Sequence, residues 1–433
     1  MSNNLNSTSQ FRPQLDALYR IGVISCVVGL LLFAGSFLGG AARNPDFWAK
    51  FYQSYLVAFM FWLGVTAGPV ALLLLHNTVG GGWGFVLKRQ LTAATGNLPL
   101  MALLTVPLVF GFHYLYPWAK PEMIEHNEVL QLQQKWMAVP MVIARLVFYF
   151  ASFMLLARNV NKWTWGMNAD NAESNTRKLN GIGPPGIILY VICVTFLAVD
   201  LMMTITPGWN TSIIGLLFVV GQGLSTFSLM CVLTAYLGAH KPPLVNVPRR
   251  YIRDIGNFML AFTLLWSYMS YGQLVITFSG NQAEEAGWYQ PRQMGGWQIV
   301  GILMVVAHFA LPFLTLLSSA VKTNISSLAK LGLIIIFMRF VDLHYWVVPG
   351  SAQPFEQQVN FARLPLDFSM PLAIGGLWLA MWSVQMRDKP IVPELDPRLY
   401  GAWPLDEFHD HVPEGYEEVP EDALSEAEMA HHG

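Results

Sequence analysis

Two stretches of the chain decide its fold. Residues 185–206 read PGIILYVICVTFLAVDLMMTIT, and residues 327–348 read SLAKLGLIIIFMRFVDLHYWVV. Each stretch is long enough to cross the roughly 30 Å hydrocarbon layer of a membrane as a single helix. Each also places one aspartate inside its apolar run, Asp200 in the first and Asp342 in the second. The sequence therefore predicts membrane helices that carry buried acidic groups.

The composition of the whole chain agrees with a membrane protein. Of the 433 residues, 54% are hydrophobic and only 12% are charged, whereas an ordinary soluble domain has about 25% charged residues. The fold class that we predict is an all-α polytopic membrane protein without a cleavable signal peptide. Its ten predicted spans are 19–40, 52–75, 97–116, 136–157, 185–206, 212–237, 255–278, 298–318, 327–348 and 366–386.

The basic residues predict how these spans are oriented. Ten crossings put both termini on one side of the membrane. That side would hold 17 of the 25 Lys and Arg residues, and the opposite loops would hold six. Because basic loops stay in the cytoplasm, both termini are expected there. Gly80–Gly82 is expected as a turn in a cytoplasmic loop between the second and third spans.

Internal similarities indicate a duplication of four helices in the same orientation. The motif Val-Asp-Leu followed by Pro-Gly occurs with identical spacing at residues 199–208 and 341–350. Arg89 precedes Gly96-Asn97 as Arg249 precedes Gly256-Asn257, and Trp136 and Trp297 open corresponding spans. Chance similarity between apolar segments is the alternative explanation.

This duplication predicts the domain organisation. Two four-helix bundles with the same orientation, helices 2–5 and helices 6–9, are flanked by helices 1 and 10. An acidic cytoplasmic tail follows, with 13 of the 27 acidic residues lying between Asp388 and Glu428. The tail is either solvated or laid across a neighbouring subunit. The predicted boundaries are 1–51, 52–208, 209–350, 351–388 and 389–433.

Ionisable groups inside the spans are the candidate functional residues. A charge at the bilayer centre costs about 2.5 to 3.5 kcal/mol on insertion scales, so such groups usually face a bundle interior or a water path. Arg339 and Asp342 share a helix face and can pair. Asp200 is expected either to relay protons or to form a buried bridge with Arg145. The proton-path candidates are Arg145, Asp200, His308, Arg339, Asp342 and His344.

Other polar residues in the spans have two explanations. They either hydrate an inner path or join helices through hydrogen bonds, the commoner role in lipid. These secondary candidates are Gln222, Tyr268, Tyr271 and Gln273. The three cysteines form no CxxC pattern, so no cofactor or metal is expected in this chain. Nucleic-acid binding is not expected either, since no basic patch has interleaved aromatic residues.

Two motifs carry a resemblance to a known family. One is Gly64–Gly84, GVTAGPVALLLLHNTVGGGWG, and the other is Trp266–Arg292, WSYMSYGQLVITFSGNQAEEAGWYQPR. Together with Asp396-Pro-Arg-Leu and the duplicated helices, they resemble the NrfD-like integral membrane subunits. The resemblance is greatest to the second of the two such subunits in bacterial alternative complex III, and it extends over nearly the whole chain.

The resemblance implies a subunit of a quinol:electron-acceptor oxidoreductase in the bacterial cytoplasmic membrane. Quinol is the substrate of such a complex, and its haem c and iron-sulfur clusters reside in partner subunits. The implied partners are a sister NrfD-like quinol-binding subunit, an iron-sulfur subunit, a multihaem cytochrome c subunit, lipids and, in some assemblies, a terminal oxidase. The chain itself is then expected to be a cofactor-free scaffold and a candidate proton-conducting subunit.

Two other functions remain open. The chain can have a quinone or quinol site of its own, because an apolar cleft with a few polar groups suits such a head group. A stand-alone secondary transporter is less favoured, because Pro69, Pro140 and Pro312 do not break corresponding helices of the two bundles.

Overall fold

The computed structural model describes residues 8–40, 46–238, 247–349 and 358–400. These ranges contain helices and no strand. The long helices are α1 (Arg12–Gly40), α2 (Phe47–Val79), α8 (Val139–Trp165), α9 (Ala172–Leu201), α10 (Ile214–Gly238), α11 (Arg249–Gly280), α16 (Ile325–Val347) and α17 (Leu364–Met386).

Shorter helices connect or extend the long ones. Before α8 these are α3 (Gly82–Thr95), α4 (Leu98–Phe110), α5 (Phe112–Leu115), α6 (Pro121–Glu125) and α7 (Glu128–Gln134). After α11 they are α12 (Ala283–Ala286), α13 (Trp297–Leu303), the π-helical segment η6 (Met304–Ala310), α14 (Leu311–Leu317), α15 (Ser319–Lys322) and the final α18 (Pro397–Tyr400).

The described helices support a multi-pass membrane protein. Eight segments are long and apolar enough to cross a membrane, and α3 with α4, bent by 42°, would make a ninth. Helix α16 is not among the eight; it carries Lys330, Arg339 and Asp342. The all-α polytopic class is therefore supported, while the number of ten spans remains a prediction. Beyond residue 400, the predicted acidic tail lies outside the described residues.

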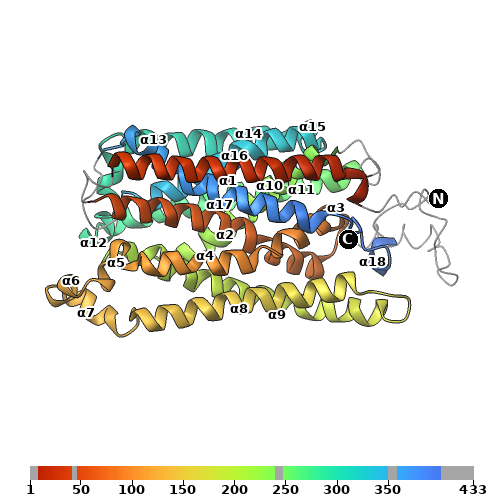
Figure 1. Ribbon diagram of the computed structural model, residues 1–433, viewed down its shortest axis with the longest axis horizontal. Helices are drawn as coiled ribbons and strands as arrows, with labels where there is room; N and C mark the ends of the chain where they lie inside the picture. The colour runs from red at the N-terminus through yellow and green to blue at the C-terminus, as the bar shows by residue number, and fades with distance from the viewer. Residues whose placement is uncertain (1–7, 41–45, 239–246, 350–357, 401–433) are drawn as a thin grey trace.

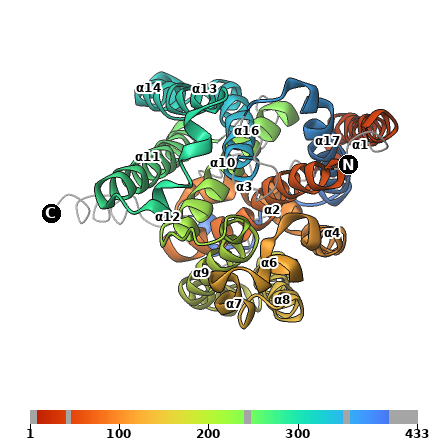
Figure 2. The ribbon, with the colours of Figure 1, turned by 90° about the vertical axis from the view of Figure 1, so that its left-hand side faces the viewer.

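Helices α2 and α10 occupy the middle of the molecule. Viewed along the helices, they are flanked by α8 and α9, by α11, α13 and α14, and by α1 and α17 (Figure 2). Helix α2 contacts α9, α10, α16 and α17, and α10 also contacts α9 and α16. Helices of both predicted bundles thus share one core, although the duplication itself stays a prediction. Figure 1 shows the long helices running side by side along the molecule.

Helix α3 is an element that the sequence analysis missed. We expected a loop there, but after the turn at Gly80 and Gly81 the chain forms a helix whose residues are all buried. The wholly buried ammonium of Lys88 pairs with Asp396 at 3.3 Å. Arg89 donates to the carbonyl of Gln385 at 2.6 Å. These partners, close to 300 residues away along the chain, make a basic helix compatible with the interior.

The segment after α17 forms a terminal clasp, defined here as residues 387–400. Asp396 lies in its middle, wholly buried, and pairs with Arg398 at 2.7 Å as well as with Lys88. Arg398 also donates to Asn77 of α2 and Asn180 of α9. The backbone N–H of Thr8 donates to the carbonyl of Lys389 at 2.9 Å. The clasp therefore ties the two ends of the described chain to one end of the bundle.

Protonation of Asp396 is expected to weaken the clasp only in strong acid. Burial alone would raise the pKa of Asp396, but the hydrogen bonds and charges of Arg398 and Lys88 outweigh it and lower the pKa from 3.8 to about 2. A lowered folded-state pKa stabilises the fold above the unfolded pKa, and this contribution is lost as the pH falls through the folded value.

We expect Asp396→Asn to lower the free energy of unfolding by about 3 kcal/mol, because two buried cations lose their counter-charge. The difference from the wild type should be fully present near pH 5 and should shrink between about pH 4 and 2. Denaturant unfolding in detergent at several pH values measures it. A difference that persists unchanged at pH 2 would contradict the ion-pair origin.

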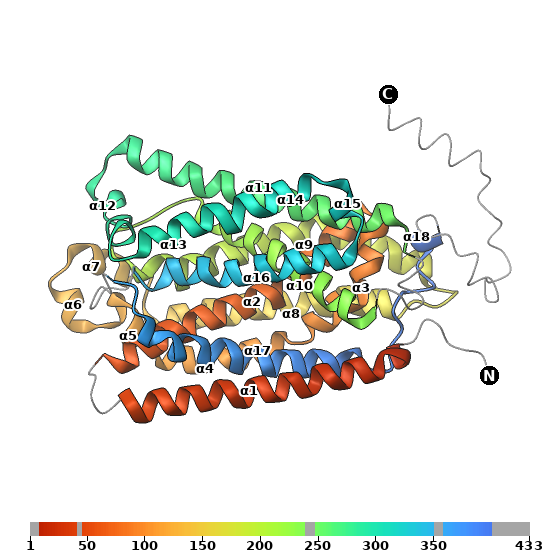
Figure 3. The same ribbon diagram turned by 90° about the horizontal axis from the view of Figure 1, so that it is seen from above.

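Close backbone contact joins α1 to α17, two helices from opposite ends of the chain (Figure 3). A Cβ atom on Gly376 would lie 2.3 Å from the carbonyl oxygen of Gly22, and one on Gly29 would lie 2.4 Å from backbone atoms of α17. Small residues at such positions let membrane helices approach closely.

Gly376→Val is therefore expected to separate α1 from α17 and to lower the free energy of unfolding by about 1 to 3 kcal/mol. The matched control is Gly35→Val on α1, where a Cβ atom meets nothing within 4 Å. Thermal unfolding of both variants in the same detergent provides the measurement. Equal stability of the two variants would show that the contact is not tight.

Candidate functional site

The first buried aspartate forms a closed ion pair. Asp200 on α9 is wholly buried and accepts two hydrogen bonds from Arg145 on α8, at 2.8 Å from Nε and 2.9 Å from Nη2. Tyr149 donates a third hydrogen bond at 3.0 Å. The Arg145 guanidinium also lies 4.5 Å from the ring centre of Trp136. The predicted bridge between Asp200 and Arg145 is thus present, while a proton-relay role for Asp200 remains a prediction.

The second buried aspartate has a different neighbourhood. Asp342 on α16 pairs with Arg339, one turn earlier on the same helix, as the spacing predicts. The indole of Trp266 on α11 donates to Asp342 Oδ2 at 3.1 Å. His308 in η6 packs edge-on against Trp266, with 4.3 Å between ring centres. These four residues, from three elements, form one cluster, which we call the Asp342 cluster.

His308 is unusual within this cluster. The ring is wholly buried, and neither nitrogen has a hydrogen-bond partner among the described residues. It sits in a π-helical segment, a rare distortion that occurs frequently at functional sites. A buried imidazole without a partner is costly unless a water or ligand satisfies it. His308 is therefore the candidate with the most unused hydrogen-bonding capacity.

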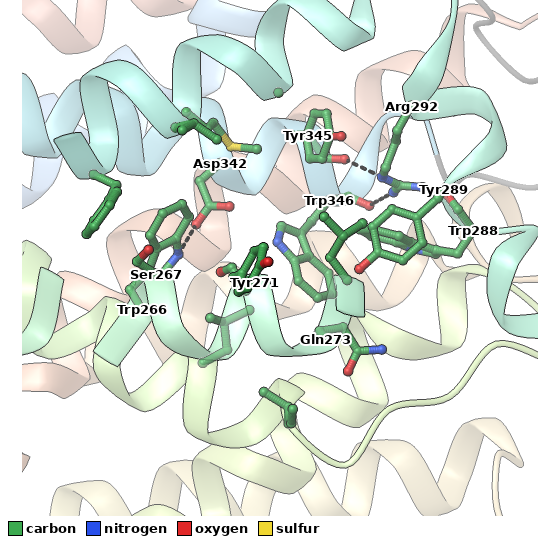
Figure 4. A pocket seen from close by; sticks show the side chains of 18 of the residues that line it. Trp266, Ser267, Tyr271, Gln273, Trp288, Tyr289, Arg292, Asp342, Tyr345 and Trp346 are labelled. Carbon is green, nitrogen blue, oxygen red and sulfur yellow. Dashed lines mark hydrogen bonds between the residues drawn. The ribbon is translucent and has the colours of Figure 1, made fainter. Parts of the chain in front are cut away.

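A pocket of about 790 Å³ lies against the Asp342 cluster, between α10, α11, α13, η6 and α16. We call it the Asp342 pocket. Its lining includes Trp288, Tyr289 and Arg292, which follow α12 in the chain; α12 and α18 lie at opposite ends of the bundle (Figure 3). Aromatic side chains from α11, α16 and the segment after α12 surround it (Figure 4). Its lining includes Trp266, Tyr271, Trp288, Tyr289, Asp342, Tyr345 and Trp346.

Arg292 provides a second charged group on the pocket wall. Its guanidinium is buried and donates to the carbonyls of Trp288, Tyr345 and Trp346. It also stacks 3.3 Å from the ring centre of Trp288. Burial lowers the pKa of Arg292 to about 9, so the group is still mainly charged at neutral pH. The carbonyls hold this cation rigidly beside the pocket, and no carboxylate of the described residues pairs with it.

Of the four secondary candidates, one joins two helices and three line the pocket. Gln222 accepts a hydrogen bond from Tyr190, which joins α10 to α9. Gln273 accepts one from Thr211 and lines the pocket. Tyr268 and Tyr271 also line the pocket, yet they are 76% and 66% exposed on the outer face of α11. These two tyrosines thus flank an opening of the pocket on the face of α11 that membrane lipids would cover.

His344 faces a different region from the other candidates. Its Nε2 lies 3.4 Å from Asp367 of α17, whose carboxylate also pairs with Arg363 at 2.8 Å. Ser54 of α2 donates to the same carboxylate. A separate cavity of about 160 Å³ borders His344, Arg363 and Asp367. The six proton-path candidates therefore fall into three clusters, centred on Asp200, Asp342 and Asp367, rather than into one.

Arg292, Arg363 and Asp367 are site residues that do not stand out in the sequence. Arg292 was visible as the end of the Trp266–Arg292 motif, but nothing local indicated that its side chain turns inward. Arg363, which caps the start of α17, and Asp367 in its first turn are four residues apart, a spacing that pairs charges on a helix and could have identified them. Among the described residues, no three His, Cys, Asp or Glu side chains are grouped to hold a metal ion.

Comparison with protein-family models and with curated protein sequences finds no match for the chain. These two comparisons therefore assign no family, and the resemblance of the two motifs to NrfD-like subunits supports only a proposal.

The Arg145–Asp200 pair predicts a coupled response to mutation. Arg145→Met should lower the free energy of unfolding by about 3 to 5 kcal/mol, because it leaves a buried carboxylate without its cation. Adding Asp200→Leu should recover most of that loss, because a buried pair can be replaced by apolar residues at little cost. Denaturant unfolding of both single variants and the double variant tests this. If the stability loss of the double variant equals the sum of the losses of the two single variants, the two residues are not coupled.

Proposed function

We propose that the chain is an integral membrane subunit of a quinol:electron-acceptor oxidoreductase of the alternative complex III type, and that it binds quinol in the Asp342 pocket. The observation that carries the proposal is a large aromatic pocket whose wall holds a buried carboxylate. Such a mainly apolar cavity with a few convergent polar groups is the usual form of a small-molecule site.

The position of the pocket favours a ligand that dissolves in the membrane. Its lining includes Tyr268 and Tyr271 of α11 and Ile302 and Val305 of α13 and η6, all of which are mostly exposed. A quinol with an isoprenoid chain could enter sideways from the bilayer and leave its chain between these helices. A soluble metabolite would have no need of an opening on this face.

The assembly follows from the resemblance of the two motifs to NrfD-like subunits. In this proposal, haem c and iron-sulfur clusters belong to partner subunits, and a sister NrfD-like subunit binds quinol as well. Both termini face the cytoplasm of a bacterium, as the basic residues predict. The chain supplies the membrane scaffold on which those partners assemble.

Proton conduction is a second candidate function of the same subunit. The observation that favours it is the buried His308, whose ring nitrogens have no partner among the described residues and whose ring packs on Trp266, the donor to Asp342. Imidazole is the side chain best suited to exchange protons near neutral pH. This function is compatible with quinol binding, because quinol oxidation releases protons.

Photo-crosslinking with an azido-quinone tests the proposed site. We expect labelled peptides from α11 and α16, and we expect Gly301→Phe to reduce labelling at least about tenfold by filling the pocket, which Gly301 lines. Gly272→Phe on α11 is the control, since a Cβ atom there meets nothing within 4 Å and Gly272 does not line the pocket. If Gly301→Phe leaves the labelling unchanged, or if labelled peptides come only from a sister subunit, the proposed site is refuted.

A further inference from the structure

The carboxylate of Asp342 gives the pocket an end that accepts hydrogen bonds. It is ion-paired with Arg339, both Arg339 and Trp266 donate to Oδ2, and the side chain of Trp346 also hydrogen-bonds to the carboxylate. A carboxylate has about four lone-pair sites, so three donors leave one site for a ligand. An ionised carboxylate can only accept hydrogen bonds. In Figure 4 the bond from Trp266 reaches one oxygen of Asp342, and the other oxygen points away from that indole. A ligand beside Asp342 must therefore offer a donor.

Arg292 gives the pocket an end that donates hydrogen bonds. A guanidinium has five N–H donors and no acceptor. Three of its nitrogen atoms each donate to one backbone carbonyl, which leaves two N–H groups for another partner. A ligand beside Arg292 must therefore offer an acceptor or a negative charge.

The two ends lie close together along α16. Arg292 is bound to the carbonyls of Tyr345 and Trp346, three and four residues after Asp342. At 1.5 Å per residue, these positions are about 5 Å apart along the helix axis. A ligand that bridges the two groups also needs room for a hydrogen bond of about 2.8 Å at each end. The aromatic rings of Trp266, Tyr345 and Trp346 line the space between.

We infer that the Asp342 pocket discriminates between redox forms and binds a hydroquinone more tightly than the corresponding quinone. A hydroquinone hydroxyl can donate to Asp342 while its other oxygen accepts from Arg292. A quinone has only acceptor oxygens, so it leaves the carboxylate facing another acceptor, and unmatched buried polar groups are costly. This selectivity rests on the proposed function, because it concerns the same pocket.

Three ligands that share one ring and one tail test the donor chemistry. The full chain in lipid nanodiscs is titrated without oxygen with decylubiquinol, decylubiquinone and the dimethyl ether of decylubiquinol. We expect decylubiquinol to bind at least about tenfold more tightly than decylubiquinone. The dimethyl ether has the ring and tail but no O–H donor, so its affinity should be as low as that of the quinone.

Asp342→Asn assigns the selectivity to one side chain. The amide can donate as well as accept, so the tenfold preference for decylubiquinol should fall to about one. Asp200→Asn is the matched control: it neutralises the equivalent aspartate of the first predicted bundle, which does not line the pocket, and the preference should be unchanged. The comparison of ligands on the wild-type chain does not depend on either variant folding.

The outcomes distinguish this selectivity from the proposed function. Equal binding of decylubiquinol and decylubiquinone would overturn the selectivity and leave the quinol site standing. If none of the three ligands binds, both the selectivity and the proposed quinol site are overturned. A preference that survives Asp342→Asn in a folded variant would overturn the role of Asp342.

Discussion

The described structure depends on the pairing of every buried carboxylate with a cation. In an interior that excludes water, removing one partner of such a pair leaves an uncompensated charge at a cost of several kcal/mol. Asp200, Asp342, Asp367 and Asp396 are all buried, and each contacts an arginine or lysine. Two of these contacts join separate elements, α8 to α9 and the clasp to α3. Charge pairing thus helps to decide which helices lie together.

The two mid-helix aspartates show how similar positions acquire different properties. Asp200 is held by two nitrogens of Arg145 and by Tyr149, and it does not line the Asp342 pocket. Asp342 takes its cation from its own helix and borders that pocket. The source of the arginine makes the difference, because Arg145 reaches over from α8 and fills the space beside Asp200. The pair within α16 leaves the neighbouring space as part of the pocket.

Short sequence patterns predicted most of the long helices and the contacts between residues that are close together in the chain. Long apolar runs identify helices such as α10 and α17 to within two residues at each end, and the spacing of Arg339 and Asp342 predicts their contact. The start of α9 lies well before the predicted span. Helix α3 could not be found in this way, because Lys88 and Arg89 make its window too polar. Their partners, Asp396 and Gln385, are close to 300 residues away, and a sequence window contains no trace of them.

The pocket was beyond prediction for a related reason. Its donor end arises because the segment after α12 folds back and places Arg292 on the carbonyls of α16. Backbone carbonyls are the same in every sequence, so no residue type marks such a contact in advance. His344 illustrates the same limit, since its partner Asp367 lies on another helix and is one of several acidic residues that it could have met. The sequence indicated six candidate residues and the pairs Arg145–Asp200 and Arg339–Asp342, but it indicated neither Arg292 nor Asp367.

The place of α17 in the bundle has a consequence for biogenesis. This helix contacts α1, α2 and α3, although ribosomes synthesise it after all the other long helices. Until α17 is synthesised, the early helices lack one neighbour, Arg89 of α3 lacks its partner Gln385 in α17, and Lys88 lacks its partner Asp396 in the clasp. Membrane insertion of the amino-terminal part should therefore yield an incompletely packed intermediate that persists until translation ends. In this intermediate an insertase or chaperone would have to keep α3 out of contact with lipid.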